Sequence, residues 1–88
     1  MAYQLKFSHT AIKQLSKLGN TESKRLLDYL KNRVLIAEHP RVYGKVLVGN
    51  FSGLWRYRVG DYRIVCEIQD DQLIILVVKL ATRGEVYR

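Results

Sequence analysis

The sequence predicts an α+β domain with the element order β-α-α-β-β-β. Two kinds of apolar periodicity lead to this prediction. Apolar residues recur every three or four positions over residues 12–34, which is helical spacing, and they alternate with polar residues over residues 3–7 and 54–68, which is strand spacing. Successive short strands joined by tight turns favour a curved, mainly antiparallel sheet, and we expect the helical hairpin to pack on one of its faces. Eighty-eight residues form one domain, residues 1–88.

The first half of the chain contains the first strand and the helical hairpin. Tyr3–Phe7 is the predicted strand, and Ser8 is the expected N-cap of a helix that ends at Gly19. A second helix starts at Asn20 or Thr21 and must end before Pro40. The expected buried stripes are Ile12, Leu15 and Leu18 on the first helix and Leu26, Leu27, Leu30 and Val34 on the second.

The second half of the chain is predicted to form strands. The candidates are Tyr43–Val48, Leu54–Val59, Tyr62–Ile68 and Leu73–Leu80. Gly60–Asp61 lies between two alternating runs and is typical of a two-residue hairpin loop.

Charge and composition restrict the class of function. The chain has 15 Lys and Arg against 8 Asp and Glu, so a polyanionic partner is expected. The single cysteine, Cys66, excludes an internal disulfide and a CxxC zinc site, and a reducing cytoplasm is the simplest location. The longest apolar run, Leu73 to Val78, is too short to cross a membrane. We therefore expect a cytoplasmic protein with no membrane, metal or cofactor.

The Gly60–Asp61 hairpin groups the most informative residues. It pairs Arg58 with Arg63 and Arg56 with Val65. Because strand side chains alternate between faces, the three arginines then share one face. The opposite face is apolar, and we expect it to lie against the helices; its members are Trp55, Tyr57, Val59, Tyr62, Ile64, Cys66 and Ile68.

Clustered arginines are suited to binding a phosphodiester. A planar guanidinium group matches two phosphate oxygens and stabilises the charge that grows during cleavage. The alternative is an ordinary solvated surface, although such surfaces usually mix the two signs of charge, and only Glu67 contributes an acid to this face of the hairpin. Arg83 and Tyr87 follow the last strand within reach of this cluster, and a tyrosine there is suited to stacking on an unpaired base. Arg41 and Lys45 are further candidates for contacts with RNA.

Two segments resemble the RelE branch of the RelE/ParE toxin superfamily. They are residues 53–65, Gly-Leu-Trp-Arg-Tyr-Arg-Val-Gly-Asp-Tyr-Arg-Ile-Val, and the closing Glu-Val-Tyr-Arg of residues 85–88. The resemblance implies the toxin of a toxin–antitoxin pair, with a RelE-like fold and a cognate antitoxin as partner in a hetero-oligomer. It further implies a metal-independent endoribonuclease that cuts messenger RNA in the ribosomal decoding site by attack of the 2′-hydroxyl. The residues that match the family's functional positions are Arg56, Arg58, Arg63, Arg83 and Tyr87.

The chain departs from the family pattern in two places. Arg56 and Arg58 stand where the best-known member has lysine, and arginine is a poor general base because it stays protonated. Ala81-Thr82-Arg83 stands where relatives commonly have Gly-His-Arg or Gly-Lys-Arg. The only histidines, His9 and His39, are expected at helix ends in structural or surface roles. Three alternatives therefore remain: a ParE-like inhibitor of DNA gyrase, a non-catalytic RNA-binding module, and a structural protein with an incidental basic face.

Overall fold

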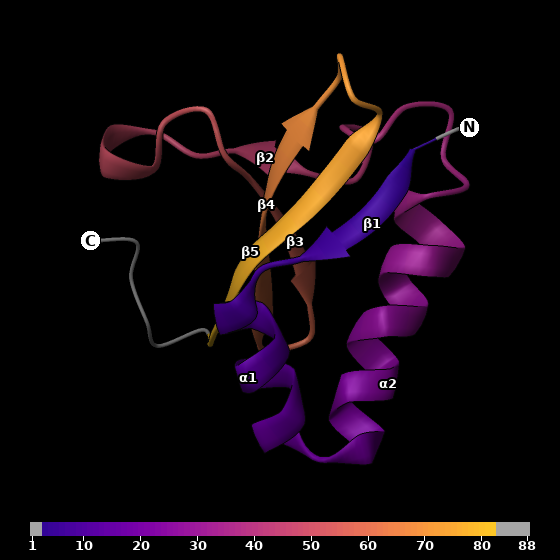
Figure 1. Cartoon of the computed structure of the whole chain (residues 1–88), viewed down its shortest axis with the longest axis vertical. Helices are drawn as coiled ribbons and strands as arrows, with labels where there is room; N and C mark the ends of the chain where they lie inside the picture. The colour runs from indigo at the N-terminus through magenta and orange to yellow at the C-terminus, as the bar shows by residue number, and fades with distance from the viewer. Residues whose placement is uncertain (1–2, 83–88) are drawn as a thin grey trace.

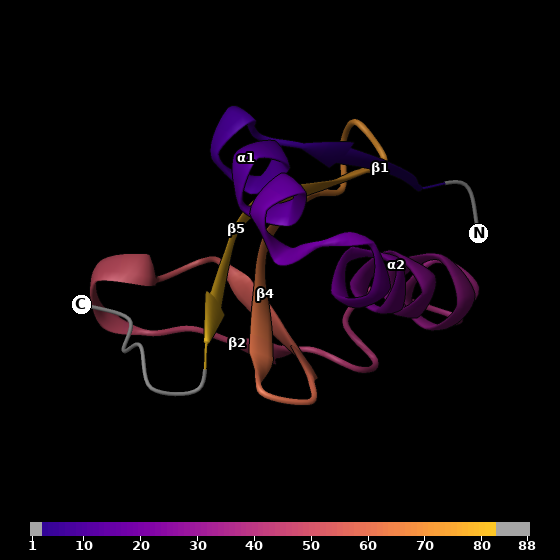
Figure 2. The same cartoon turned by 90° about the horizontal axis from the view of Figure 1, so that it is seen from below.

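The computed structural model describes residues 3–82, which form two α-helices on one side of a five-stranded mixed sheet. The sheet order is β1-β5-β4-β3-β2, with β1 parallel to β5 and every other pair antiparallel. Figure 2 shows that α1 and α2 lie on one side of the curved sheet. The elements are β1 Gln4–Phe7, α1 His9–Leu18, α2 Asn20–Tyr29, the π-helical turn η1 Leu30–Val34, β2 Lys45–Val46, the 3-10 turn η2 Gly49–Phe51, β3 Trp55–Val59, β4 Tyr62–Gln69 and β5 Ile74–Thr82. The predicted fold class is confirmed.

Helix α1 begins and ends where the sequence predicts, but one expected core residue is exposed. The Ser8 side chain caps the helix by accepting a hydrogen bond of 3.0 Å from the Ala11 amide. Gly19 ends it with a φ of 86° that disfavours residues with a side chain. Ala11 is completely buried, whereas Ile12, predicted to be buried, is 54% exposed. The prediction for Ile12 was wrong because the side of α1 nearest the sheet is centred on the small Ala11.

Side chains of α1 complete the edge of strand β5. Strand β1 pairs with residues 74–77 of β5 and then turns into α1, which leaves the backbone of residues 78–82 without a strand on that side. The Gln14 amide replaces it: its nitrogen donates to the Leu80 carbonyl at 3.0 Å, and its oxygen accepts from the Leu80 amide at 2.7 Å. The Ser8 hydroxyl donates to the Val78 carbonyl. These bonds satisfy backbone groups that would otherwise be unpaired and fix α1 against the sheet.

The second helix continues as a π-helical turn, which the sequence analysis did not predict. The α2 segment ends at Tyr29, and the Leu35 amide then bonds to the Leu30 carbonyl at 2.9 Å, five residues earlier. Because an α-helix has about 3.6 residues per turn, side chains spaced four residues apart move gradually around the helix axis. The wider π-helical turn compensates for this rotation and places Val34 on the same side as Leu26 and Leu30. All three side chains are buried as predicted.

The predicted strand Tyr43–Val48 is much shorter than expected. Only Lys45–Val46 forms β2, where it pairs with β3. Residues 39–44 form turns before β2, and Gly49, with a φ of 72°, starts η2 after it. The chain therefore leaves the sheet at both ends of this short strand. Gly44 also has no room for a side chain, because a Cβ atom there would lie 3.0 Å from the Tyr57 ring.

The core lies between the helices and the apolar face of the sheet. Tyr57 is completely buried there, and its hydroxyl donates a hydrogen bond to the Pro40 carbonyl. Burial raises the pKa of the Tyr57 hydroxyl, so it remains a donor. No helix within residues 3–82 is long and apolar enough to cross a membrane. The core side chains are Ala11, Leu26, Leu30, Val34, Tyr57, Val59, Ile64, Cys66, Ile75, Val77 and Leu80.

Candidate nucleic-acid interface

The β3–β4 hairpin places three arginines on the face of the sheet that points away from the helices. Arg58 lies directly opposite Arg63, and Arg56 lies opposite Val65, which is the predicted register. Gly60 turns the chain with a φ of 60°. Their neighbours Tyr57, Val59, Ile64 and Cys66 face the core, so the alternation of side chains predicted from the sequence is confirmed. We call this surface the arginine face; its charged members are Lys45, Arg56, Arg58, Arg63, Glu67 and Lys79, and the side chains of Val65 and Ala81, which lie among them, are buried.

The three arginines form no ion pair with any of residues 3–82. Arg58 is exposed, whereas Arg56 and Arg63 are partly buried. The Nη1 atom of Arg63 is shielded from solvent and has no hydrogen-bond partner within the described residues. A shielded, charged donor without a partner is costly, so we expect Arg63 to have a partner outside residues 3–82.

Two lysines extend the arginine face across the sheet. Lys45 of β2 lies opposite Arg56 and is exposed, so this candidate is placed beside the arginines. Lys79 of β5 lies opposite Val65 and was not singled out by the sequence analysis. Its ammonium group lies 4.5 Å from the centre of the Phe51 ring. A register shift between Val65 and Cys66 brings Lys79 to this face, and strand alternation alone could not reveal it.

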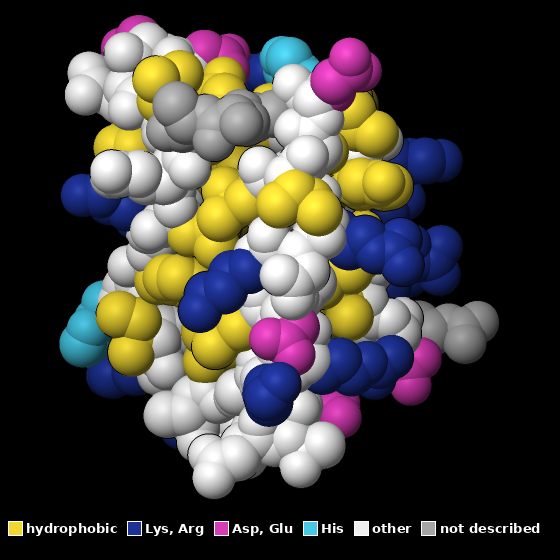
Figure 3. Space-filling view, turned by 90° about the vertical axis from the view of Figure 1, so that its right-hand side faces the viewer, with side chains coloured by type: hydrophobic (Ala, Val, Ile, Leu, Met, Phe, Trp, Pro, Cys, Tyr) yellow, Lys and Arg dark blue, Asp and Glu magenta, His cyan; other side chains and the backbone are white. Residues whose placement is uncertain are grey.

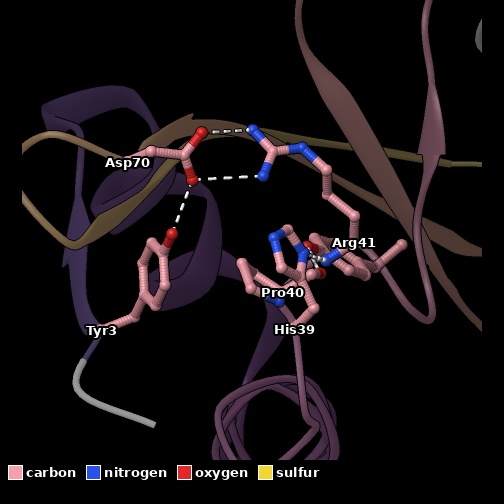
Figure 4. A network of polar contacts seen from close by, with 6 residues as sticks. Tyr3, His39, Pro40, Arg41 and Asp70 are labelled. Atoms are coloured by element: carbon pink, nitrogen blue, oxygen red, sulfur yellow. Dashed lines mark hydrogen bonds and ion pairs between the residues drawn. The ribbon is translucent and has the colours of Figure 1, made fainter.

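Arg41 lies apart from the other candidates, on the helix side of the sheet. Figure 4 shows its two-pronged ion pair with Asp70, with nitrogen–oxygen distances of 3.1 and 2.8 Å. The Arg41 guanidinium also lies 5.4 Å from the centre of the Trp55 ring. Its hydrogen bond, together with one from the Tyr3 hydroxyl, lowers the pKa of Asp70 to about 2. An RNA contact by Arg41 remains a prediction, and this arginine already has an anionic partner.

Neither the two histidines nor Cys66 supplies a proton carrier on the arginine face. Arg83 and Tyr87 lie outside the described residues. His9 begins α1, and the Nδ1 atom of His39 accepts a hydrogen bond of 3.3 Å from the Arg41 amide, so both histidines lie away from the arginine face. Burial raises the pKa of the Cys66 thiol, which stays protonated and faces the core. Within residues 3–82, no three His, Cys, Asp or Glu side chains are grouped closely enough to hold a metal ion.

Comparison with known proteins identifies the family. Residues 5–87 match the family model described as the ParE toxin of type II toxin–antitoxin systems. The chain therefore belongs to the RelE/ParE toxin superfamily of type II toxin–antitoxin systems. Within it, the chain is 32% identical over 90 residues to the mRNA interferase toxin RelE of Escherichia coli, a match that covers 99% of this chain and 92% of the relative. It is also 25% identical to the toxin RelG of Mycobacterium tuberculosis, over 100% of this chain and 99% of the relative.

Solved structures agree with this assignment. The toxin–antitoxin complex RelBE of Mycobacterium tuberculosis contains a chain that superposes with a TM-score of 0.80 at 23% identity, over 94% of this chain and 93% of that one. The archaeal RelE–RelB complex of Pyrococcus horikoshii contains a chain with a TM-score of 0.71 at 26% identity, over 98% of this chain and 100% of that one. The RelE-like fold predicted from the sequence is therefore confirmed.

Proposed function

We propose that this chain is a RelE-like toxin that cleaves messenger RNA in the ribosomal decoding site and thereby stops translation. The observation that carries the proposal is the arginine face, where Arg63 keeps a shielded guanidinium nitrogen without a partner among the described residues. Its Escherichia coli relative at 32% identity is an mRNA interferase, which supports the same chemistry here. The proposal assigns Arg58 and Arg63 to the scissile phosphate, and Arg56 to a further electrostatic contact.

During cleavage, the arginines stabilise the negative charge that develops on the phosphate. The 2′-oxygen of the RNA attacks the adjacent phosphorus, the bond to the 5′-oxygen breaks, and a cyclic phosphate and a free 5′-hydroxyl result. The phosphate oxygens gain negative charge in the transition state, and fixed guanidinium groups stabilise that charge without first shedding a hydration shell. This contribution needs permanently charged side chains, a requirement that arginine meets better than lysine.

The proton transfers need other groups. The 2′-hydroxyl must lose a proton and the 5′-oxygen must gain one, and a protonated arginine cannot act as the base. We assign the first transfer to Tyr87, Glu85 or a group of the ribosomal RNA, and stabilisation or protonation of the leaving 5′-oxygen to Arg83. Tyr87 also orients a codon base by stacking. Lys45, and less directly Arg41, bind neighbouring phosphates.

A cognate antitoxin protein is the second expected partner. The archaeal relative at 26% identity was solved as a RelE–RelB complex, and we propose an equivalent hetero-oligomer for this chain. Apolar side chains suited to a protein partner are exposed between η1 and η2, with Ile36 at 74% and Val48 at 80% exposure. These residues lie away from the core and contribute little to folding in this structure.

Induction of the chain in growing cells, followed by mapping of transcript ends, tests the proposal. We expect new 5′-ends that fall at a fixed position within codons of translated regions, and their loss when translation initiation is blocked. The family model carries the ParE name, so a gyrase inhibitor is the second candidate. Intact transcripts with trapped gyrase–DNA complexes would favour it, and intact transcripts with RNA binding alone would identify a non-catalytic module.

A further inference from the structure

Lys79 occupies the arginine face only because strand β5 contains an irregularity. Ile75 and Val77 are buried in the core, and strict alternation would send Lys79 to the core as well. Instead, Cys66 pairs with Val77 while its neighbour Val65 pairs with Lys79, so β5 has one extra residue at this point. Beyond this point the inward and outward positions of β5 are exchanged, so the Lys79 side chain points to the arginine face and not to the core.

The shift also returns a leucine to the core. Leu80 is 5% exposed and packs with the core residues, although it follows Lys79 directly. Gln14 binds both backbone groups of Leu80, so the new phase is fixed by two hydrogen bonds from α1. The position of Lys79 is therefore built into the fold and is not a chance orientation of a flexible side chain.

Phe51 holds the ammonium group of Lys79 without neutralising it. The turn η2 lies on the side of the sheet away from α2 (Figure 2), and the Phe51 ring lies 4.5 Å from the ammonium nitrogen. An aromatic ring attracts a cation but leaves its charge and its donors available for a phosphate. Lys79 forms no ion pair with any of residues 3–82.

We propose that Lys79 binds the phosphate next to the scissile one, which makes it an RNA-binding residue of this site. The inference rests on the proposed function. Lys45, Arg56, Val65 and Lys79 are successive partners across β2, β3, β4 and β5, so they form one row perpendicular to the strands. Neighbouring strands are about 4.8 Å apart, which separates the backbones of Arg56 and Lys79 by about 10 Å. Val65, which lies between Arg56 and Lys79, is completely buried, so an RNA strand that runs from β3 to β5 contacts the two cations on either side of it.

The test compares Lys79→Gln with Lys31→Gln. Lys31 is an exposed lysine of η1 on the helix side and forms no ion pair with the described residues, so both variants lose one charge. A fluorescent 2′-O-methyl oligoribonucleotide, which cannot be cleaved, is titrated with purified protein at several salt concentrations. We expect Lys79→Gln to weaken binding about threefold to tenfold and to reduce the slope of log affinity against log salt by about 0.7, the value for one phosphate contact on a single strand. Lys31→Gln should retain the wild-type slope, and Lys79→Arg should restore it.

The outcomes separate this inference from the proposed function. A wild-type slope in Lys79→Gln, or an equal loss in Lys31→Gln, overturns the role of Lys79 even if the wild-type protein cleaves messenger RNA. A reduced slope in Lys79→Gln supports that role even if the wild-type protein cleaves nothing, in which case the nuclease proposal alone fails. If the wild-type protein does not bind the oligonucleotide, the role of Lys79 is overturned.

Discussion

The two sides of the sheet differ in the ion pairs that their positively charged side chains form. On the helix side, three cations have carboxylate partners among the described residues, whereas others, such as Lys31, have none. Figure 3 shows basic and acidic side chains next to each other on the side formed by α2 and β1. On the arginine face, within residues 3–82, Arg56, Arg58 and Arg63 have no carboxylate partner. The ion pairs of the helix side are Lys24–Asp28 at 2.9 Å, Arg25–Glu22 at 3.8 Å and Arg41–Asp70 at 2.8 Å.

The absence of carboxylate partners for Arg56, Arg58 and Arg63 within residues 3–82 supports the proposal that the arginine face binds an external anion. Two arginines in directly opposite positions repel each other, which costs a few tenths of a kcal/mol, and a shielded donor without a partner costs more. Folding alone gives no reason for either arrangement. Residues that oppose stability in this way are typical of functional sites, where the compensating interaction comes from the substrate.

The largest expected effect is on cleavage. Arg63→Ala should lower the single-turnover rate of messenger RNA cleavage on translating ribosomes about 100-fold to 1,000-fold, because it removes a fixed charge from the transition state. Lys24→Ala is the matched control, since it removes one positive charge from an exposed pair on the helix side. It should change the rate less than twofold. Equal rates for the two variants, with unchanged circular dichroism, would contradict the distinction between the two sides.

The second effect is on the response to a simple anion. Inorganic phosphate should raise the melting temperature of the wild-type protein, because a ligand that binds only the folded state stabilises it. At about five times its dissociation constant, phosphate contributes about 1 kcal/mol, or about 4–8 °C for a domain of this size. Sodium chloride at equal ionic strength controls for screening. The shift should disappear in Arg63→Met and persist in Lys24→Ala; a shift that survives in Arg63→Met would place the anion elsewhere.

A third effect is on stability without ligand, and here the two sides should respond with opposite signs. Arg63→Met replaces a guanidinium that lacks a partner by an apolar side chain of similar length, and we expect the free energy of unfolding in urea to rise by up to about 1 kcal/mol. Arg25→Met should lower it slightly, because it removes the ion pair with Glu22. A destabilised Arg63→Met would mean that this guanidinium already has a stabilising role in the free protein.

Local patterns predicted most of the fold and the centre of the site. The Gly60–Asp61 turn fixes the register of β3 and β4, and the period of two then places Arg56, Arg58 and Arg63 on one face. The helical hairpin follows in the same way from apolar spacing and from Gly19. These features depend on residues that are close in sequence, so they can be predicted from the sequence alone.

Features that depend on distant contacts could not be predicted. Lys79 reaches the arginine face through a register shift between β4 and β5 that no turn residue marks. Arg41 looked equivalent to Lys45 in the sequence, but Asp70, which lies 29 residues further along the chain, binds it on the helix side. The π-helical turn at Leu30–Val34 likewise reflects packing of Val34 against the core.

The smallest expected effect is the acid sensitivity that the Arg41–Asp70 pair confers. The pKa of Asp70 in the folded protein is about 2, below its ordinary value of 3.8, mainly because of the Arg41 hydrogen bond. The ionised carboxylate therefore contributes stability above pH about 4, and this contribution is lost as the pH falls through about 2. The free energy of unfolding of the wild type in urea should fall more steeply across this window than that of Asp70→Asn or Arg41→Gln. Asp71→Asn is the control, because Asp71 has no ion-pair partner in residues 3–82, and its profile should follow the wild type. Because the pair is exposed, the difference should be small. If Asp70→Asn and wild type have parallel profiles, Arg41 is effectively unpaired in solution, and it then joins the cations available to RNA.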